Sequence, residues 1–114
     1  MKITKTRKTE IMIINLYKCG TKKNHDADYC LAKNIMNLIL LCFQLISIFT
    51  GTDHMRIVQK LYFSEKNILS AGIQCMQGVV YVQERTLLLY RRKYCEVIDA
   101  LFVLIENFEF ANVS

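Results

Sequence analysis

The side chains best suited to chemistry lie together early in the chain, in a polar loop. Cys19, His25 and Cys30 stand there, with the acids Asp26 and Asp28 between the last two. Thiolate, imidazole and carboxylate groups are the usual ligands of zinc. The spacing Cys-x5-His-x4-Cys matches no standard zinc pattern, however, which favours a loop that merely contains these residue types. We therefore expect no metal site.

Other signs of catalysis are scattered. His54 is the one remaining histidine, and the glycines stand too far apart to form a phosphate-binding loop. The 5 cysteines are an odd number at irregular spacing, which does not indicate a disulfide framework. Residues 112–114 fit a glycosylation sequon, but they lie at an end that we predict below to be cytoplasmic, so we interpret the match as accidental. We expect neither an enzyme nor a cofactor.

An uncharged run from residue 34 to 52, NIMNLILLCFQLISIFTGT, dominates the sequence. As a helix it would be roughly 28 Å long at about 1.5 Å per residue. That length nearly matches the hydrocarbon core of a bilayer, which is about 30 Å thick. Small soluble domains rarely contain a helix that is apolar on every face. We predict a transmembrane helix over 34–52.

Residues 67–90 predict a second transmembrane helix, although asparagine and glutamine dilute its apolar character. Ala71, Cys75 and Gly78 recur there at positions i, i+4 and i+7, so they form one face of small side chains. In a membrane such a face lets a neighbouring helix approach closely. In a soluble core the same residues would fit a tight contact, and the sequence favours neither interpretation.

The charged segments predict how these helices are oriented. Residues 1–33 are strongly basic, with a mobile lead-in over 1–10, whereas the connector 53–66 is nearly balanced. Because cytoplasmic loops are enriched in lysine and arginine, we expect the N-terminus in the cytoplasm, the connector outside and the plasma membrane as the location. We expect the connector to form a short amphipathic helix on the membrane surface.

Cations also mark the end of the second run. Arg91, Arg92 and Lys93 follow it directly. So short a basic patch beside apolar runs more often meets anionic headgroups than nucleic acid, so we predict a membrane boundary here. Residues 91–114 then predict a cytoplasmic amphipathic helix. The expected fold is all-α, with two transmembrane helices in a hairpin plus this amphipathic helix.

From about residue 34 to 110 the order of features resembles the amino-terminal part of insect odorant receptors. Asp53 stands where that family has an acidic residue early in its first connector. The stretch RRKYCEVIDALFVL is similar to the family's basic-aromatic segment, with matching residue types at Arg92, Tyr94, Val97, Ile98 and Leu101. Residues 1–33 lack the family's entry helix and its tryptophan-proline turn.

The resemblance implies a fragment of a seven-helix odorant receptor, which is a ligand-gated cation channel subunit in olfactory signalling. It implies small hydrophobic odorants, an odorant co-receptor subunit and the lipid bilayer as partners. The family's pore-lining helix would lie outside this chain.

A second interpretation remains open, that of a small soluble all-helical module that binds a partner protein. In that case residues 34–52 would form the central helix, wrapped by 54–66, 67–90 and 94–110. The two interpretations differ in one structural property. A soluble core helix is covered on all sides, whereas a membrane helix presents an apolar belt.

Overall fold

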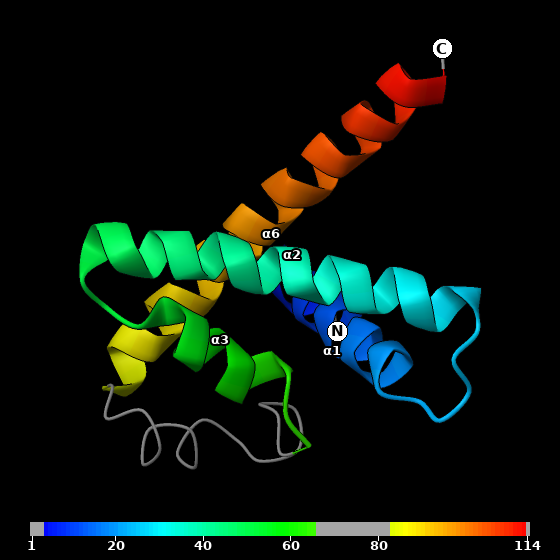
Figure 1. Cartoon of the computed structure of the whole chain (residues 1–114). Coiled ribbons are helices and arrows are strands. Elements are labelled where there is room, and N and C mark those ends of the chain that lie inside the picture. The colour runs from blue at the N-terminus through cyan, green and yellow to red at the C-terminus, as the bar shows by residue number, and fades with distance from the viewer. Residues whose placement is uncertain (1–3, 66–82, 114) are drawn as a thin grey trace.

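The computed structural model describes residues 4–65 and 83–113. All regular structure in that part is helical, which confirms the all-α class (Figure 1). The helices are α1 (Lys5–Gly20), α2 (Ala27–Thr50), α3 (His54–Tyr62) and α6 (Glu84–Val113). Most of the predicted second span lies outside the described residues, and so do Ala71, Cys75 and Gly78.

Helix α1 corrects the prediction of a mobile lead-in, which is wrong from Lys5 onward. The Thr4 hydroxyl accepts a hydrogen bond from the Arg7 amide at 3.1 Å and so caps the first turn. Glu10 shares a helix face with Ile13 and Ile14, and all three side chains are buried. The lead-in looked disordered because its cations are conspicuous, whereas the partners of Glu10 lie far along the chain.

Helix α2 contains nearly all of the uncharged run and begins before it. The Asp26 carboxylate caps its start by accepting from the Tyr29 amide at 2.9 Å. Gly51 ends it in the left-handed conformation, with φ of 76°, which a residue with a Cβ adopts only with strain. The polar loop that joins α1 to α2 is therefore short, and the two helices pack against each other.

Helix α3 is amphipathic, as predicted, but its apolar side faces the other helices. The Asp53 carboxylate caps it by accepting from the Arg56 amide at 3.1 Å. Ile57, Val58 and Tyr62 are buried in the core. The chain turns back after α2 and lays α3 along it, next to α1 (Figure 1).

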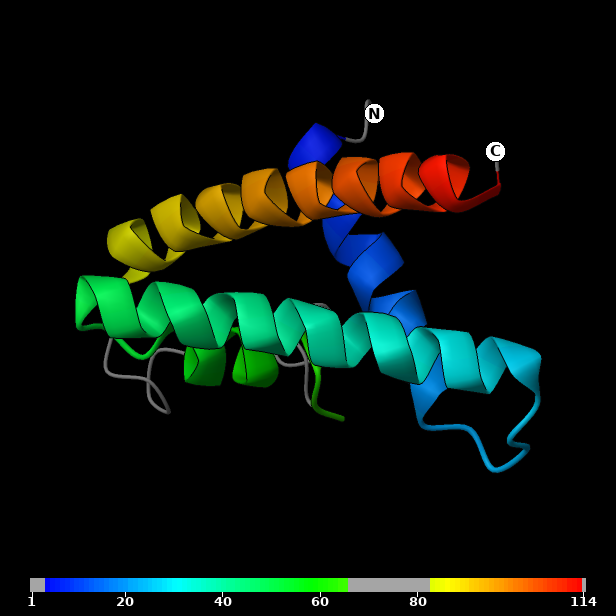
Figure 2. The same ribbon diagram turned by 45° about the horizontal axis from the view of Figure 1, so that its top comes forward.

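Helix α6 runs without interruption through Arg91, Arg92 and Lys93, and the predicted amphipathic segment 91–114 lies within it up to residue 113. Its first half packs on the other helices, and its second half extends beyond them (Figures 1 and 2).

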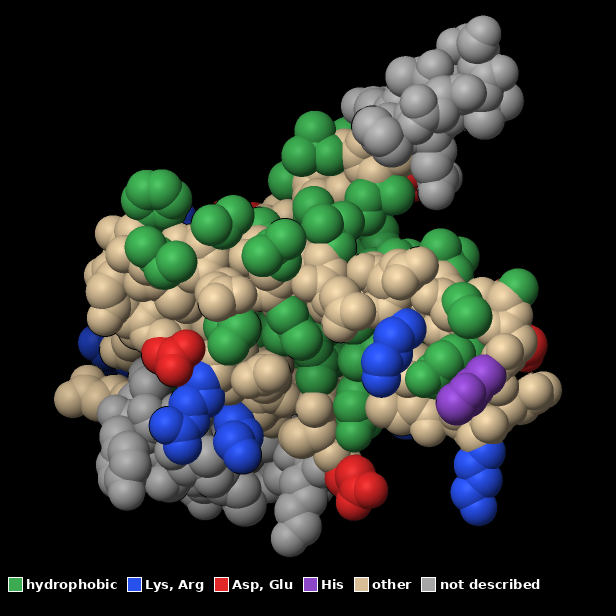
Figure 3. All heavy atoms as spheres, in the orientation of Figure 1, with side chains coloured by type: hydrophobic (Ala, Val, Ile, Leu, Met, Phe, Trp, Pro, Cys, Tyr) green, Lys and Arg blue, Asp and Glu red, His purple; other side chains and the backbone are tan. Residues whose placement is uncertain are grey.

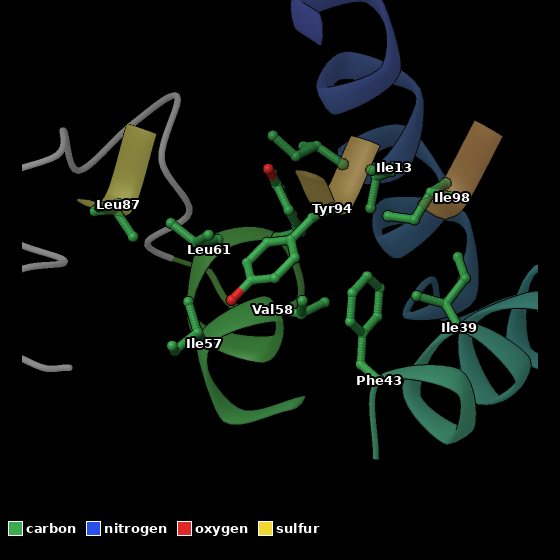
Figure 4. Close-up of a cluster of buried hydrophobic side chains, with 11 residues drawn as sticks. Ile13, Ile39, Phe43, Ile57, Val58, Leu61, Leu87, Tyr94 and Ile98 are labelled. Carbon is green, nitrogen blue, oxygen red and sulfur yellow. The ribbon is translucent and has the colours of Figure 1, made fainter. Parts of the chain in front are cut away.

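The core lies where α1, α2, α3 and α6 converge. In Figure 4 the Tyr94 ring of α6 points between Phe43 of α2 and the residues of α3. The Phe43 and Tyr94 rings meet edge to face, with centroids 5.1 Å apart. The buried hydrophobic residues of this cluster are Ile13, Ile14, Ile39, Phe43, Ile57, Val58, Leu61, Tyr62, Leu87, Tyr94 and Ile98.

Candidate functional site

The most distinctive surface of the molecule is the side of α2 that no other described helix covers. We call it the outer face of α2. Its large apolar side chains are all exposed, and Ile48 and Phe49 show 70% and 86% of their surface to solvent. They recur at the three- and four-residue spacing that places side chains on one side of a helix. The outer face consists of Leu31, Leu38, Leu41, Leu45, Ile48 and Phe49.

The opposite side of α2 is its inner face, which packs on α1 and α3. Its buried members are Ala32, Met36, Ile39 and Phe43. Only 22% of the most apolar 18-residue stretch of α2 is buried. Among the residues that the structure describes, α2 is the one helix long and apolar enough to cross a bilayer. A core helix of a soluble protein meets the same criteria of length and composition, but it is mostly covered.

The apolar surface continues from α2 onto α6. Leu88 and Leu89 are about half exposed near the start of α6, and Val103 and Leu104 are exposed further along it. Figure 3 shows apolar side chains along α2 and on α6 behind it, while charged groups gather below α2 and at one end. Exposed apolar surface of this extent is unusual for a soluble monomer and marks a contact with lipid or protein.

One border of the outer face is polar. Lys33, Asn37 and Gln44 follow one another along α2 at four- and seven-residue spacing, and all three are exposed. We call this row the polar edge. It separates most of the apolar outer face from a side suited to water or to headgroups, although the exposed Asn34 lies among the apolar side chains at the same helical spacing.

A buried polar cluster fixes α1, α3 and α6 relative to one another. Arg91 donates from Nε to Glu10 Oε2 at 2.8 Å and from a terminal nitrogen to Glu10 Oε1 at 2.6 Å. The Tyr62 hydroxyl donates to the same Glu10 Oε2 at 2.6 Å. We call these three residues the Glu10 cluster. The carboxylate thus receives a two-point contact from the guanidinium plus a phenol, which is a strong arrangement.

The Glu10 cluster is shielded from water. Glu10 and Tyr62 are both 0% exposed. Burial, together with the Glu10 charge, raises the pKa of Tyr62 well above its usual value. The hydrogen bonds that Arg91 donates to Glu10 raise the pKa of Arg91. At neutral pH the cluster therefore contains a neutral phenol and a charged guanidinium, and its hydrogen bonds join α1, α3 and α6.

A second buried polar contact joins α3 to α6. His54 Nδ1 and the Tyr94 hydroxyl oxygen are 2.6 Å apart, and the Tyr90 ring meets the imidazole edge to face at 4.9 Å. Burial lowers the pKa of His54, an effect that the Asp53 charge partly opposes. Burial also raises the pKa of Tyr94. A positive charge on His54 is further disfavoured by its place at the N-terminus of α3.

We expect the stability of the fold to fall in mild acid because of His54. A histidine whose pKa is lower in the folded protein than in the unfolded chain binds a proton more readily in the unfolded chain, so acid favours unfolding. The free energy of unfolding should thus be level above about pH 6.5 and decrease as the pH falls below that value. Urea titrations between about pH 7.5 and pH 5 measure it. H54Q should flatten the dependence of the unfolding free energy on pH, whereas H25Q, at an exposed position, should retain it. An unchanged slope in H54Q would assign the effect to other groups.

The structure separates the three predicted boundary cations. Arg91 points inward to Glu10, and only 12% of its side chain is exposed. Arg92 and Lys93 are exposed. Their contact with a membrane boundary stays a prediction, and Arg91 has a partner of its own inside the protein.

The residues of the early polar loop do not gather around a common point. The Cys19 thiol contacts the Asp28 carbonyl oxygen at 3.5 Å, and the His25 ring stacks on Tyr29 with centroids 4.1 Å apart. Within residues 4–65 and 83–113 no group of three histidine, cysteine or acidic residues is placed to hold a metal ion.

A cavity of about 360 Å³ opens between the start of α1 and α6. Two cations and two acids line it, so their charges offset each other and favour no class of ligand. Burial and nearby acids raise the pKa of the Cys95 thiol in its wall to about 12, which leaves that thiol unreactive. The lining residues are Lys5, Thr6, Arg92, Cys95, Glu96 and Asp99.

Sequence reasoning missed Glu10, Tyr62, His54 and Tyr94 as interacting residues. One signal pointed to Glu10, because it is the only acid before Asp26 in a segment crowded with cations. No sequence signal identified its partners, which lie 52 and 81 residues away.

Searches of protein families, of curated proteins and of solved structures found no match to this chain.

Proposed function

We propose that this chain acts in a membrane, with the outer face of α2 in contact with lipid. One observation carries the proposal, namely that a long helix with no charge after Lys33 has an outer face of large apolar side chains that the described residues leave exposed. A soluble helical module would bury this helix in its centre. Here α1 and α3 cover only the inner face, and leucines, an isoleucine and a phenylalanine remain exposed on the other side.

The class of membrane protein rests on the resemblance to odorant receptors. On that basis the chain is part of a ligand-gated cation channel subunit in olfactory signalling, with odorants and a co-receptor subunit as its partners. For the assembled receptor the resemblance implies a hairpin with α2 as the first span, residues 67–90 as the second and both ends in the cytoplasm, and this arrangement requires α1 and α3 to separate from the inner face of α2. The all-helical fold and the composition of α2 support this proposal.

Flotation with phosphatidylcholine vesicles tests the contact with lipid. We expect the full chain to rise with the vesicles in a density gradient, and to do so equally at high salt. Salt screens electrostatic attraction but does not weaken the burial of apolar side chains in lipid.

Recovery of the chain at the bottom of the gradient, as a monodisperse monomer in detergent-free buffer, would contradict the proposal. The outer face would then be a surface for a protein partner. Flotation that disappears at high salt would also count against the outer face, because it would assign binding to surface cations.

A further inference from the structure

We infer that α2, while α1 and α3 pack on its inner face, lies in the plane of the membrane along one surface, with its outer face toward the lipid tails. The partner is thus a lipid surface, and one side of the protein contacts it. This inference rests on the proposed contact between α2 and lipid, and it adds how the helix is oriented.

The contacts between α1 and α3 are the first reason. These helices flank the two ends of α2, so a spanning α2 would separate them across the bilayer. In the structure the Tyr62 hydroxyl of α3 donates to Glu10 of α1 at 2.6 Å. The Tyr17 ring of α1 also stacks near the Phe63 ring that follows α3, with centroids 6.3 Å apart. The two flanks of α2 therefore lie on the same side of it.

The charges on α1 and α3 are the second reason. Both helices pack on the inner face of α2, and their outward side chains include exposed cations such as Lys8 and Lys60. If α2 crossed the bilayer with this packing intact, these cations would be carried to the depth of the hydrocarbon, where charged side chains are strongly disfavoured. With α2 in the plane of the membrane they remain in water.

The polar edge fits the same orientation. A helix that lies in the interface has an apolar face about 5–10 Å below the boundary between headgroups and acyl chains, with polar residues along its sides. Lys33, Asn37 and Gln44 border one side of the outer face in this way over the middle half of α2. Lys33 would then stand at the level of the headgroup phosphates.

Tryptophan fluorescence can measure the orientation, because the chain contains no tryptophan of its own. The variants L31W, L41W and F49W place one reporter each near the start, the middle and the end of the outer face. Quenching by phosphatidylcholine brominated at defined acyl carbons then gives the depth of each reporter. K60W, on the exposed side of α3, is the matched control.

If α2 lies in the plane, L31W, L41W and F49W share one shallow depth and K60W is not quenched. Positions 31 and 49 are about 27 Å apart along the helix axis at 1.5 Å per residue. A spanning α2 would therefore give a deep L41W and shallow L31W and F49W, which would overturn the inference while leaving the contact with lipid intact.

Two further outcomes would also overturn the inference. If no variant is quenched and none floats with vesicles, the proposed function fails together with it. If the reporters have blue-shifted emission before lipid is added and are then not quenched, a second copy of the chain covers the outer face instead of lipid.

Discussion

The E10A variant is expected to lose about 3–5 kcal/mol of unfolding free energy, the range for breaking a buried ion pair from one side. Removing the Glu10 carboxylate leaves the Arg91 guanidinium without its counter-charge and the Tyr62 hydroxyl without its acceptor. Both groups would remain in the core with their desolvation uncompensated. Because α1 and α6 meet at this carboxylate, we expect unfolding to begin with their separation. Urea denaturation followed by circular dichroism measures the loss.

Two controls separate the buried pair from charge effects in general. K22A removes the exposed ion pair between Lys22 and Asp26 and should leave the denaturation midpoint unchanged, since solvent screens that pair. The combined variant E10L, Y62F and R91M replaces the whole Glu10 cluster by apolar side chains and should recover most of the stability lost in E10A. An E10A protein as stable as the parent would show that the cluster does not form in solution.

The L41D variant is expected to weaken binding to neutral vesicles by roughly 2–3 kcal/mol, or about 30- to 150-fold, because an ionised aspartate is costly among acyl chains. Aspartate is preferred to lysine for this test, since a lysine can extend its ammonium to the headgroups. Leu41 is 54% exposed, so L41D should fold normally and keep its circular dichroism spectrum. Titration with vesicles measures the partition coefficient.

Q44D is the matched control for this experiment. It adds the same charge to the same helix only three residues away, but on the polar edge. We expect its vesicle binding to stay within about threefold of the parent, because charged substitutions near the interface cost little. Equal losses in L41D and Q44D would indicate that net charge, and not the outer face, controls binding.

The sequence predicted the main helices for reasons that are local. The uncharged run and the glycine near its end predicted most of α2 and its C-terminal end, whereas the helix starts at Ala27, seven residues before the run. The apolar spacing after residue 90 placed the later part of α6 in the same way. Helix α1 was missed because its threonines are weak helix formers and its first turns have no apolar periodicity, and because the helix is stabilised by partners on α3 and α6.

The exposure of α2 was the property that the sequence left open. The sequence left two alternatives for this helix, covered on all sides or presenting an apolar belt, and the structure leaves Leu41 half exposed and lays α1 and α3 on the other side. Arg91 was similarly interpreted as a headgroup contact. It packs together with Tyr62 against Glu10, because burying a carboxylate requires partners that compensate its lost hydration.

The sequence by itself determined that the chain is helical and that one helix is long, uncharged and apolar, since capping, periodicity and composition act over a few neighbouring residues. Only the tertiary structure decided which side of that helix is covered and which residues meet in the core. Those outcomes depend on contacts between segments 52 and 81 residues apart, as for Glu10 with Tyr62 and with Arg91. Contacts at such separations form when the helices pack, and no short pattern in the sequence encodes them.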